Sequence, residues 1–67
     1  MSARDSLILG FFEYVHLDEH FKPVARRFYE LAHWIAAELP QGAERSKALA
    51  KLLLAKDAAL DALKAPT

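Results

Sequence analysis

A few aromatic and basic side chains in this sequence have the chemistry needed to hold a nucleotide. Tyr14 stands in a polar stretch, and Arg26 and Arg27 follow in a segment with helical character. An aromatic ring in a loop can stack on a nucleobase, and a guanidinium can hold a phosphate through two hydrogen bonds. The candidate ligand-binding residues are Tyr14, Arg26, Arg27, His16 and Lys56, with Tyr29 in support. Side chains of these types would suit a small phosphorylated ligand.

The two adjacent arginines cannot both serve such a ligand. Neighbouring residues on a helix point about 100° apart, so at most one of Arg26 and Arg27 aims at a given molecule. Either side chain could instead remain solvated or pair with Glu30, because surface ion pairs of this kind are common. The residues alone leave both interpretations open.

A metal site is a further alternative. His16 and His20 are four residues apart, and Glu30 and His33 have the Glu-x-x-His spacing found in di-metal carboxylate bundles. Such a site needs two more carboxylates aimed at the same point, and a histidine beside an apolar stripe is more often a hydrogen-bonded boundary residue. We expect neither a metal nor another cofactor.

Catalytic patterns are missing from the sequence. It has no cysteine, and its few hydroxyl residues have no histidine spaced for a catalytic triad. Two glycines in all do not make a phosphate-binding loop. A chain of 67 residues also leaves little room for an enclosed substrate pocket. We expect that the protein is not an enzyme.

Two helical segments would have to position the candidate residues. Between Phe21 and Leu39 the large apolar residues recur at steps of three and four, which predicts an amphipathic helix that faces another helix. This apolar stripe consists of Phe21, Val24, Phe28, Leu31 and Ile35. We expect the helix to begin near Lys22 with Pro23 at its first position, after a loose turn in which Asp18 is an N-cap.

The second helical segment follows a sharp break. Pro40 cannot continue a helix and Gly42 relaxes the turn, so the chain reverses within a few residues. From Glu44 to about Ala65 the sequence is rich in Ala, Leu and Lys, which are strong helix formers. Lys56 interrupts its apolar seam. So short a connection predicts antiparallel helices.

The N-terminal region adds one smaller element. Residues 1–13 predict a helical turn at most, which Gly10 interrupts. The predicted fold is therefore all-α: a short N-terminal helical segment and a long antiparallel helical hairpin, forming a single domain over residues 1–67.

Composition favours self-association. The hydrophobic fraction is 54%, more than a two-helix hairpin of this length can bury, and no disulfide can stabilise the monomer. We expect Trp34 to pack across a subunit interface or under the N-terminal segment.

Charge and hydropathy limit the other partners. The net charge is zero, so the basic excess of a duplex-DNA binder is missing. The apolar run Leu7–Phe12 is too short to span a bilayer and lacks a cleavage site after it. We expect no DNA partner, no membrane partner and a cytosolic location.

Five short motifs follow one another along most of the chain, from about Phe12 to Leu63. They are Phe12-Glu13-Tyr14-x-His16-Leu17, Phe28-x-x-Leu31-Ala32, Leu39-Pro40, Glu44-Arg45-Ser46-x-Ala48-Leu49 and Ala55-Lys56-Asp57-Ala58-Ala59. In order and spacing they resemble the hairpin family of phage anti-CBASS cyclic-oligonucleotide sponges, whose domain also occurs in anti-Thoeris sponges.

The resemblance implies a non-enzymatic viral protein that assembles from interlocked dimers into a hexamer. Such a protein works in the cytoplasm of the infected bacterial host. It sequesters cyclic dinucleotides such as cyclic GMP–AMP, and also cyclic trinucleotides, without hydrolysing them. This blocks CBASS-type immune signalling.

The resemblance also assigns roles to residues. An aromatic at the position of Tyr14 stacks on the bases in a pocket between subunits, and a basic residue at the position of Arg26 contacts the phosphate. Relatives tend to read Lys-Pro-Phe there. The trinucleotide site of the family uses a basic residue of the C-terminal helix. This chain has Asp61 at that position, so Lys64 or Lys56 would have to supply the positive charge. Glu44-Arg45 is expected to fix the hairpin turn.

One alternative function does not involve a ligand. The same apolar stripes are typical of a structural self-assembly module, or of a module that binds a partner helix, with no small molecule bound. A response to cyclic nucleotides would separate the two functions.

Overall fold

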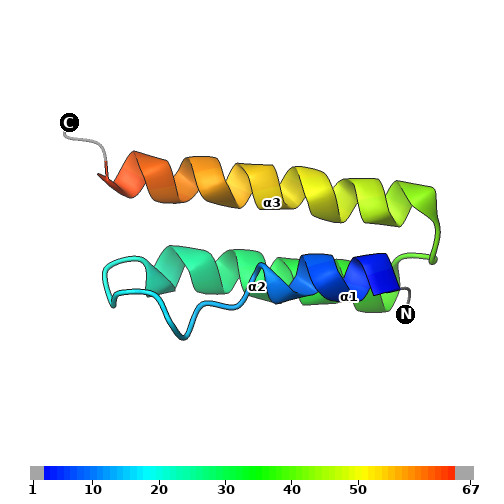
Figure 1. Cartoon of the computed structure of the whole chain (residues 1–67), viewed down its shortest axis with the longest axis horizontal. Helices are drawn as coiled ribbons and strands as arrows, with labels where there is room; N and C mark the ends of the chain where they lie inside the picture. Colours follow the sequence, from blue (N-terminus) through cyan, green and yellow to red (C-terminus); the bar gives the residue numbers. More distant parts are fainter. Residues whose placement is uncertain (1–2, 65–67) are drawn as a thin grey trace.

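The structure is a computed structural model that describes residues 3–64. Its elements are α1 (Ala3–Gly10), α2 (Lys22–Glu38) and α3 (Ala43–Lys64), and no strand occurs within this range (Figure 1). The all-α fold class is therefore confirmed. The predicted last turn at Ala65 lies outside the described residues.

The two long helices lie side by side and run in opposite directions, with a tight turn between them (Figure 1). The shorter α1 lies against both of them, over the half of the pair next to that turn. A loop of residues 11–21 then leads to the far end, where α2 begins. The molecule measures 39 × 20 × 17 Å, so much of each long helix stays near solvent.

The start of α2 agrees with its sequence pattern, but its cap does not. The helix begins at Lys22, as predicted, and Pro23 is its second residue rather than its first. The N-cap is Phe21, which has helical dihedrals and makes no side-chain cap hydrogen bond. The prediction that Asp18 caps the helix is wrong. The turn ahead of α2 is already helical in shape, with the Phe21 amide donating to the Asp18 carbonyl at 2.9 Å.

The first helix is longer than the single turn that its sequence predicts. It has eight residues, with Asp5 fully buried and Leu9 nearly so. Phe12, just after it, is fully buried as well. Isolated helices of this length are unstable in water, so these tertiary contacts stabilise α1.

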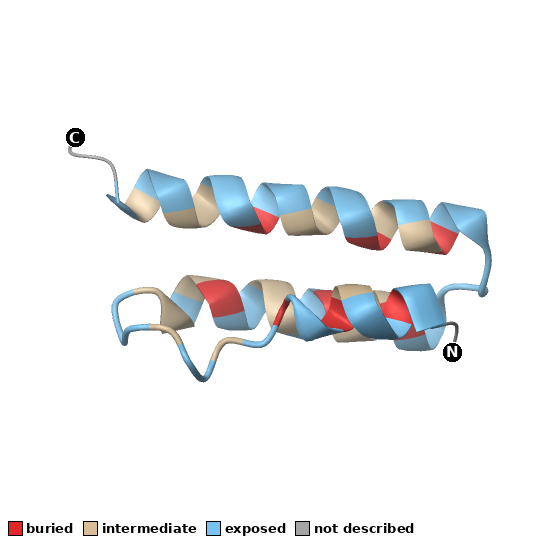
Figure 2. Cartoon of the chain, viewed as in Figure 1, coloured by how far each residue is buried: buried red, intermediate tan, exposed pale blue. Residues whose placement is uncertain are grey.

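The most deeply buried residues of α2 are three alanines that adjoin the predicted apolar stripe. Ala25 and Ala32 are fully buried and Ala36 nearly so, whereas the stripe residue Leu31 is 44% exposed. The other stripe residues are half-buried. Small side chains let neighbouring helices approach closely, so the large ones lie to either side of the contact. Figure 2 shows the buried residues on the inner faces of the three helices.

Candidate ligand-binding site

One shallow groove brings two of the predicted site residues together. Tyr14, from the loop before α2, and Arg26, from the second turn of α2, line the same open depression of about 330 Å³. Its other lining residues are Glu19, Lys22 and Pro23. An aromatic ring and a guanidinium therefore flank a space large enough for part of a nucleotide.

Aromatic packing holds Tyr14 in place. Its ring contacts Tyr29 edge to face, with 5.3 Å between ring centroids, and is half-buried. Tyr29 in turn lies 4.3 Å from the ring of His33. The Nε2 atom of His33 is buried and has no hydrogen-bond partner among the described residues. This row of rings fixes Tyr14 although its backbone belongs to a loop.

Arg26 is exposed and weakly engaged. Its Nε donates to Glu30 at 3.3 Å, and both side chains are more than half exposed. Lys22 pairs with Glu19 in the same way at 2.9 Å. Exposed pairs of this kind contribute only about 0–1 kcal/mol, so a phosphate can displace the carboxylates at small cost.

Arg27 is not among the residues that line the groove of Tyr14. It lines a separate depression with Arg26 and Glu30, and another beside Phe28 and Leu31. The groove that holds Tyr14 includes Arg26 and not Arg27. This arrangement follows the 100° step between adjacent residues of a helix.

Lys56 and His16 do not join this groove. Lys56 is buried in α3, where its ammonium donates to the carbonyl of Phe11 and lies 5.6 Å from the ring centroid of Phe12. His16 is exposed in the loop and is not among the groove's lining residues. Lys64, the other predicted substitute for a trinucleotide contact, is exposed and lies 3.7 Å from Asp61.

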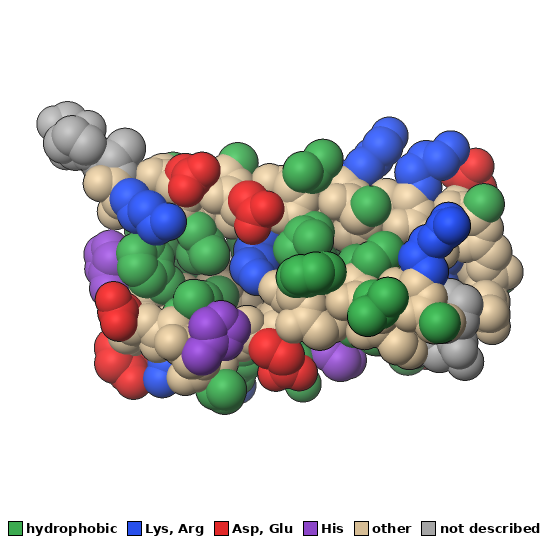
Figure 3. Space-filling view, viewed as in Figure 1, with side chains coloured by type: hydrophobic (Ala, Val, Ile, Leu, Met, Phe, Trp, Pro, Cys, Tyr) green, Lys and Arg blue, Asp and Glu red, His purple; other side chains and the backbone are tan. Residues whose placement is uncertain are grey.

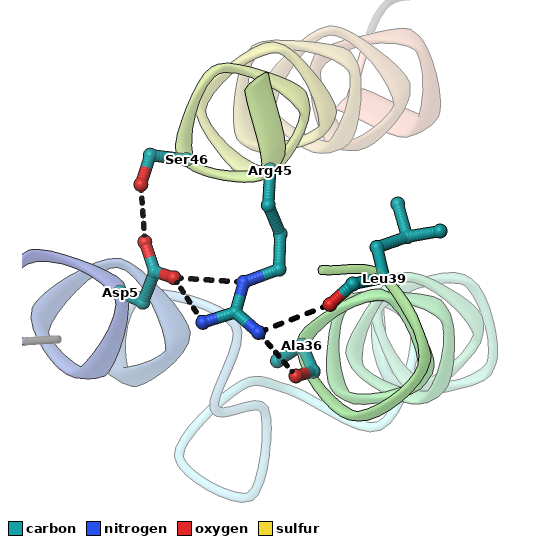
Figure 4. A network of polar contacts seen from close by, with 5 residues as sticks. All are labelled: Asp5, Ala36, Leu39, Arg45 and Ser46. Atoms are coloured by element: carbon teal, nitrogen blue, oxygen red, sulfur yellow. Dashed lines mark hydrogen bonds and ion pairs between the residues drawn. The ribbon is translucent and has the colours of Figure 1, made fainter. Parts of the chain in front are cut away.

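A buried polar network lies at the other end of the molecule. The sequence predicted a role for Arg45 there but not for Asp5 or Ser46. Arg45 donates from Nη2 and Nε to Asp5 at 2.7 and 3.0 Å, and from Nη1 to the carbonyls of Ala36 and Leu39 at 2.9 and 3.2 Å (Figure 4). Ser46 donates to the other oxygen of Asp5 at 2.6 Å. Arg45 thus holds the hairpin turn and also anchors α1. The expected partner residue in that role, Glu44, is exposed and pairs with Lys47 instead.

Pro40 is the sequence feature that could have predicted this network. In a continuing helix the Ala36 carbonyl would accept from residue 40, but proline has no N–H. The guanidinium of Arg45 supplies the missing donor. An arginine in the first turn of a helix is also on the wrong end for the helix dipole, which indicates a specific partner.

Over residues 3–64, no three His, Asp or Glu side chains converge as a metal site would require. None of the helices described is long and apolar enough to span a membrane.

Comparison of the chain with protein-family models, curated proteins and solved structures gave no match.

Proposed function

We propose that the protein binds cyclic dinucleotides such as cyclic GMP–AMP and sequesters them without hydrolysis, as phage anti-CBASS sponges do. The observation that supports this most directly is the shared groove of Tyr14 and Arg26. Stacking on a base and charge-assisted hydrogen bonds to a phosphate are the two contacts that a cyclic dinucleotide offers.

The arrangement of Tyr14 favours binding. Because Tyr29 already holds its ring, little side-chain freedom is lost when a base stacks on the free face. Sequestration needs an aromatic and cations rather than catalytic groups. The groove supplies the ring of Tyr14 and two cations, each paired with one exposed carboxylate.

Self-association is part of the proposal. A cyclic dinucleotide has two bases and two phosphates, so one open groove contacts half of it. A second copy would contribute its own Tyr14 and Arg26 to the other half and enclose the ligand between subunits. Interlocked dimers that form a hexamer satisfy this requirement, and the bacterial cytoplasm during phage infection is where such ligands occur. Cyclic trinucleotides would bind through a different contact.

Calorimetry and thermal shift with cyclic GMP–AMP test the proposal. Tyr14→Ala should abolish binding, whereas Tyr14→Phe should keep most of it because stacking needs the ring and not the hydroxyl. Arg26→Gln should weaken binding at least about tenfold, and Arg27→Gln should change it much less. The ligand should be recovered chemically unchanged. Normal binding by a folded Tyr14→Ala variant would refute the assignment.

A second function has its own observation in support. Leu7 and Phe11 are 71% and 63% exposed, which is typical of a surface that contacts another protein. A structural self-assembly module, or one that binds a partner helix, would leave them so. This alternative predicts no thermal shift with any cyclic di- or trinucleotide.

A further inference from the structure

Four exposed side chains form a continuous strip along the outer side of α2. Arg27, Leu31, Trp34 and Glu38 follow one another at steps of four, three and four, which places them on one face of the helix. Trp34 is 56% exposed and Leu31 44%. We call these four residues the α2 strip. An indole this exposed, between two charges, is typical of a protein interface.

The charges at the two ends of the strip have no ion-pair partner among residues 3–64. Arg26, one residue away, pairs with Glu30, but Arg27 and Glu38 form no ion pair with any residue between 3 and 64. Glu38 also lies in the last turn of α2, which contains no basic residue. The negative end of the helix dipole makes an uncompensated carboxylate unfavourable there. A cation from outside the chain would remove both deficits.

We infer that the α2 strip packs against the α2 strip of a second copy of this chain, with the two helices antiparallel. A two-fold axis midway between residues 31 and 34 places Arg27 opposite the second copy's Glu38. It places Leu31 opposite the second copy's Trp34. Both contacts occur twice, as in any isologous interface. Each arginine then lies beside the C-terminus of the opposite helix, where the dipole favours a cation.

The order of residues in the strip selects a second copy over an unrelated partner. Along the helix the strip reads positive, apolar, apolar, negative. When a second copy runs in the opposite direction, each charge meets the opposite charge and each apolar residue meets an apolar one. The strip from Arg27 to Glu38 extends about 16 Å along the helix at about 1.5 Å per residue, so two ion pairs enclose two apolar contacts. The hydrophobic excess of the sequence already favours self-association.

This contact does not depend on a nucleotide. Tyr14 packs on Tyr29, which points to another side of α2 than the strip does. In this arrangement the adjacent arginines have different roles, since Arg26 lines the groove and Arg27 contacts the second copy.

The exposed apolar residues outside the α2 strip do not define how a partner would be aligned on them. Figure 3 shows hydrophobic side chains over α1 and the adjoining part of α3. Leu7 of α1, Phe11 just after it and Leu54 of α3 are all exposed. They carry no paired opposite charges that would fix the identity or direction of a partner.

Charge reversal tests the proposed register. Sedimentation equilibrium of the full chain should show that Arg27→Glu and Glu38→Arg each weaken association at least about tenfold, because each creates two like-charge contacts per dimer. The double variant should return to within about threefold of the original protein. Circular dichroism checks that all the variants are folded. Unchanged association in the single variants, or no recovery in a folded double variant, would overturn the inference. A parent protein that is monomeric at about 1 mM would do the same.

Cross-linking provides an independent readout, since the chain has no cysteine. Arg27→Cys and Glu38→Cys variants, mixed and treated with a short bis-maleimide, should form a cross-linked heterodimer. Each variant alone should not, because equal positions lie about 16 Å apart in the antiparallel register. Efficient cross-linking of either variant alone, or none in the mixture, contradicts this register.

Discussion

Replacing Asp5 by alanine should be one of the most damaging single changes in this chain. Asp5 has no solvent exposure and Arg45 has 7%, so their ion pair is closed off from water. Without the carboxylate, two guanidinium donors of Arg45 lose their acceptor in a place that water hardly reaches. The Ser46 hydroxyl loses its acceptor as well.

The size of the effect follows from this burial. Removing one partner of a buried ion pair costs about 3–5 kcal/mol, because the remaining charge has no compensation. A domain of this length has a total free energy of unfolding of about 3–10 kcal/mol. Asp5→Ala should therefore leave a protein with little or no remaining stability, in which α1 has lost its main polar anchor.

Urea unfolding followed by far-ultraviolet circular dichroism measures the loss. Asp61→Ala is the matched control, because Asp61 is exposed and lies 3.7 Å from Lys64. It should change the free energy of unfolding by less than about 1 kcal/mol.

A double-mutant cycle with Arg45→Met separates the ion pair from the capping of α2. Arg45→Met should be strongly destabilising alone, since it also removes the donors to the Ala36 and Leu39 carbonyls. The Asp5→Ala/Arg45→Met variant should be more stable than the sum of the single effects predicts, because no unpaired charge is left buried. If Asp5→Ala costs less than about 1 kcal/mol, or if the two effects add, the pair behaves as a surface ion pair and our reasoning is wrong.

Two further substitutions test the backbone and the helix packing. Gly42 has φ of 155°, which side chains rarely adopt, so Gly42→Ala should cost about 1–2 kcal/mol in urea unfolding although no atom lies within 4 Å of the new methyl group. Gly10→Ala, at the helical end of α1 with similar free space, should be neutral or stabilising and is its control. Ala32→Leu should lower the free energy of unfolding by at least about 1–3 kcal/mol, because Ala32 is fully buried and a larger side chain must separate α2 from its neighbours; an equally stable Ala32→Leu protein would show that the helices are not closely packed there.

Features of the fold that depend on local chemistry were predictable from the sequence. The start of α2 at Lys22 follows from Pro23, which is tolerated in a first turn, and the reversal follows from Pro40 and Gly42. The helical length of α1 was not predictable in this way, because its stability comes from residues about forty positions away in α3.

Periodicity also could not decide which side of α2 is innermost. The apolar stripe and the alanines adjoin on one broad face, and hydrophobicity alone favours the larger residues. Packing distance favours the smaller ones, and only the structure reveals Ala32 at the contact.

The sequence predicted the types of residue in the candidate site better than it predicted which residues line the groove. Of the two adjacent arginines, only Arg26 lines the groove of Tyr14, although both line a neighbouring depression. That only one of them meets a ligand stays a prediction. Lys56 was recognised as an interruption of the seam. Its ammonium instead contacts the Phe11 carbonyl, a contact between segments 45 residues apart that no local pattern encodes.

The alanine face of α2 has a consequence for how the protein behaves at different concentrations. Because the interior accepts methyl groups, bulkier residues such as Leu31 and Trp34 remain outside. In the proposed self-association these side chains become buried only when two molecules meet, so dilution alone would expose them to water again. The protein's solubility and its melting temperature should both depend on protein concentration, and measurements at a single concentration would miss this dependence.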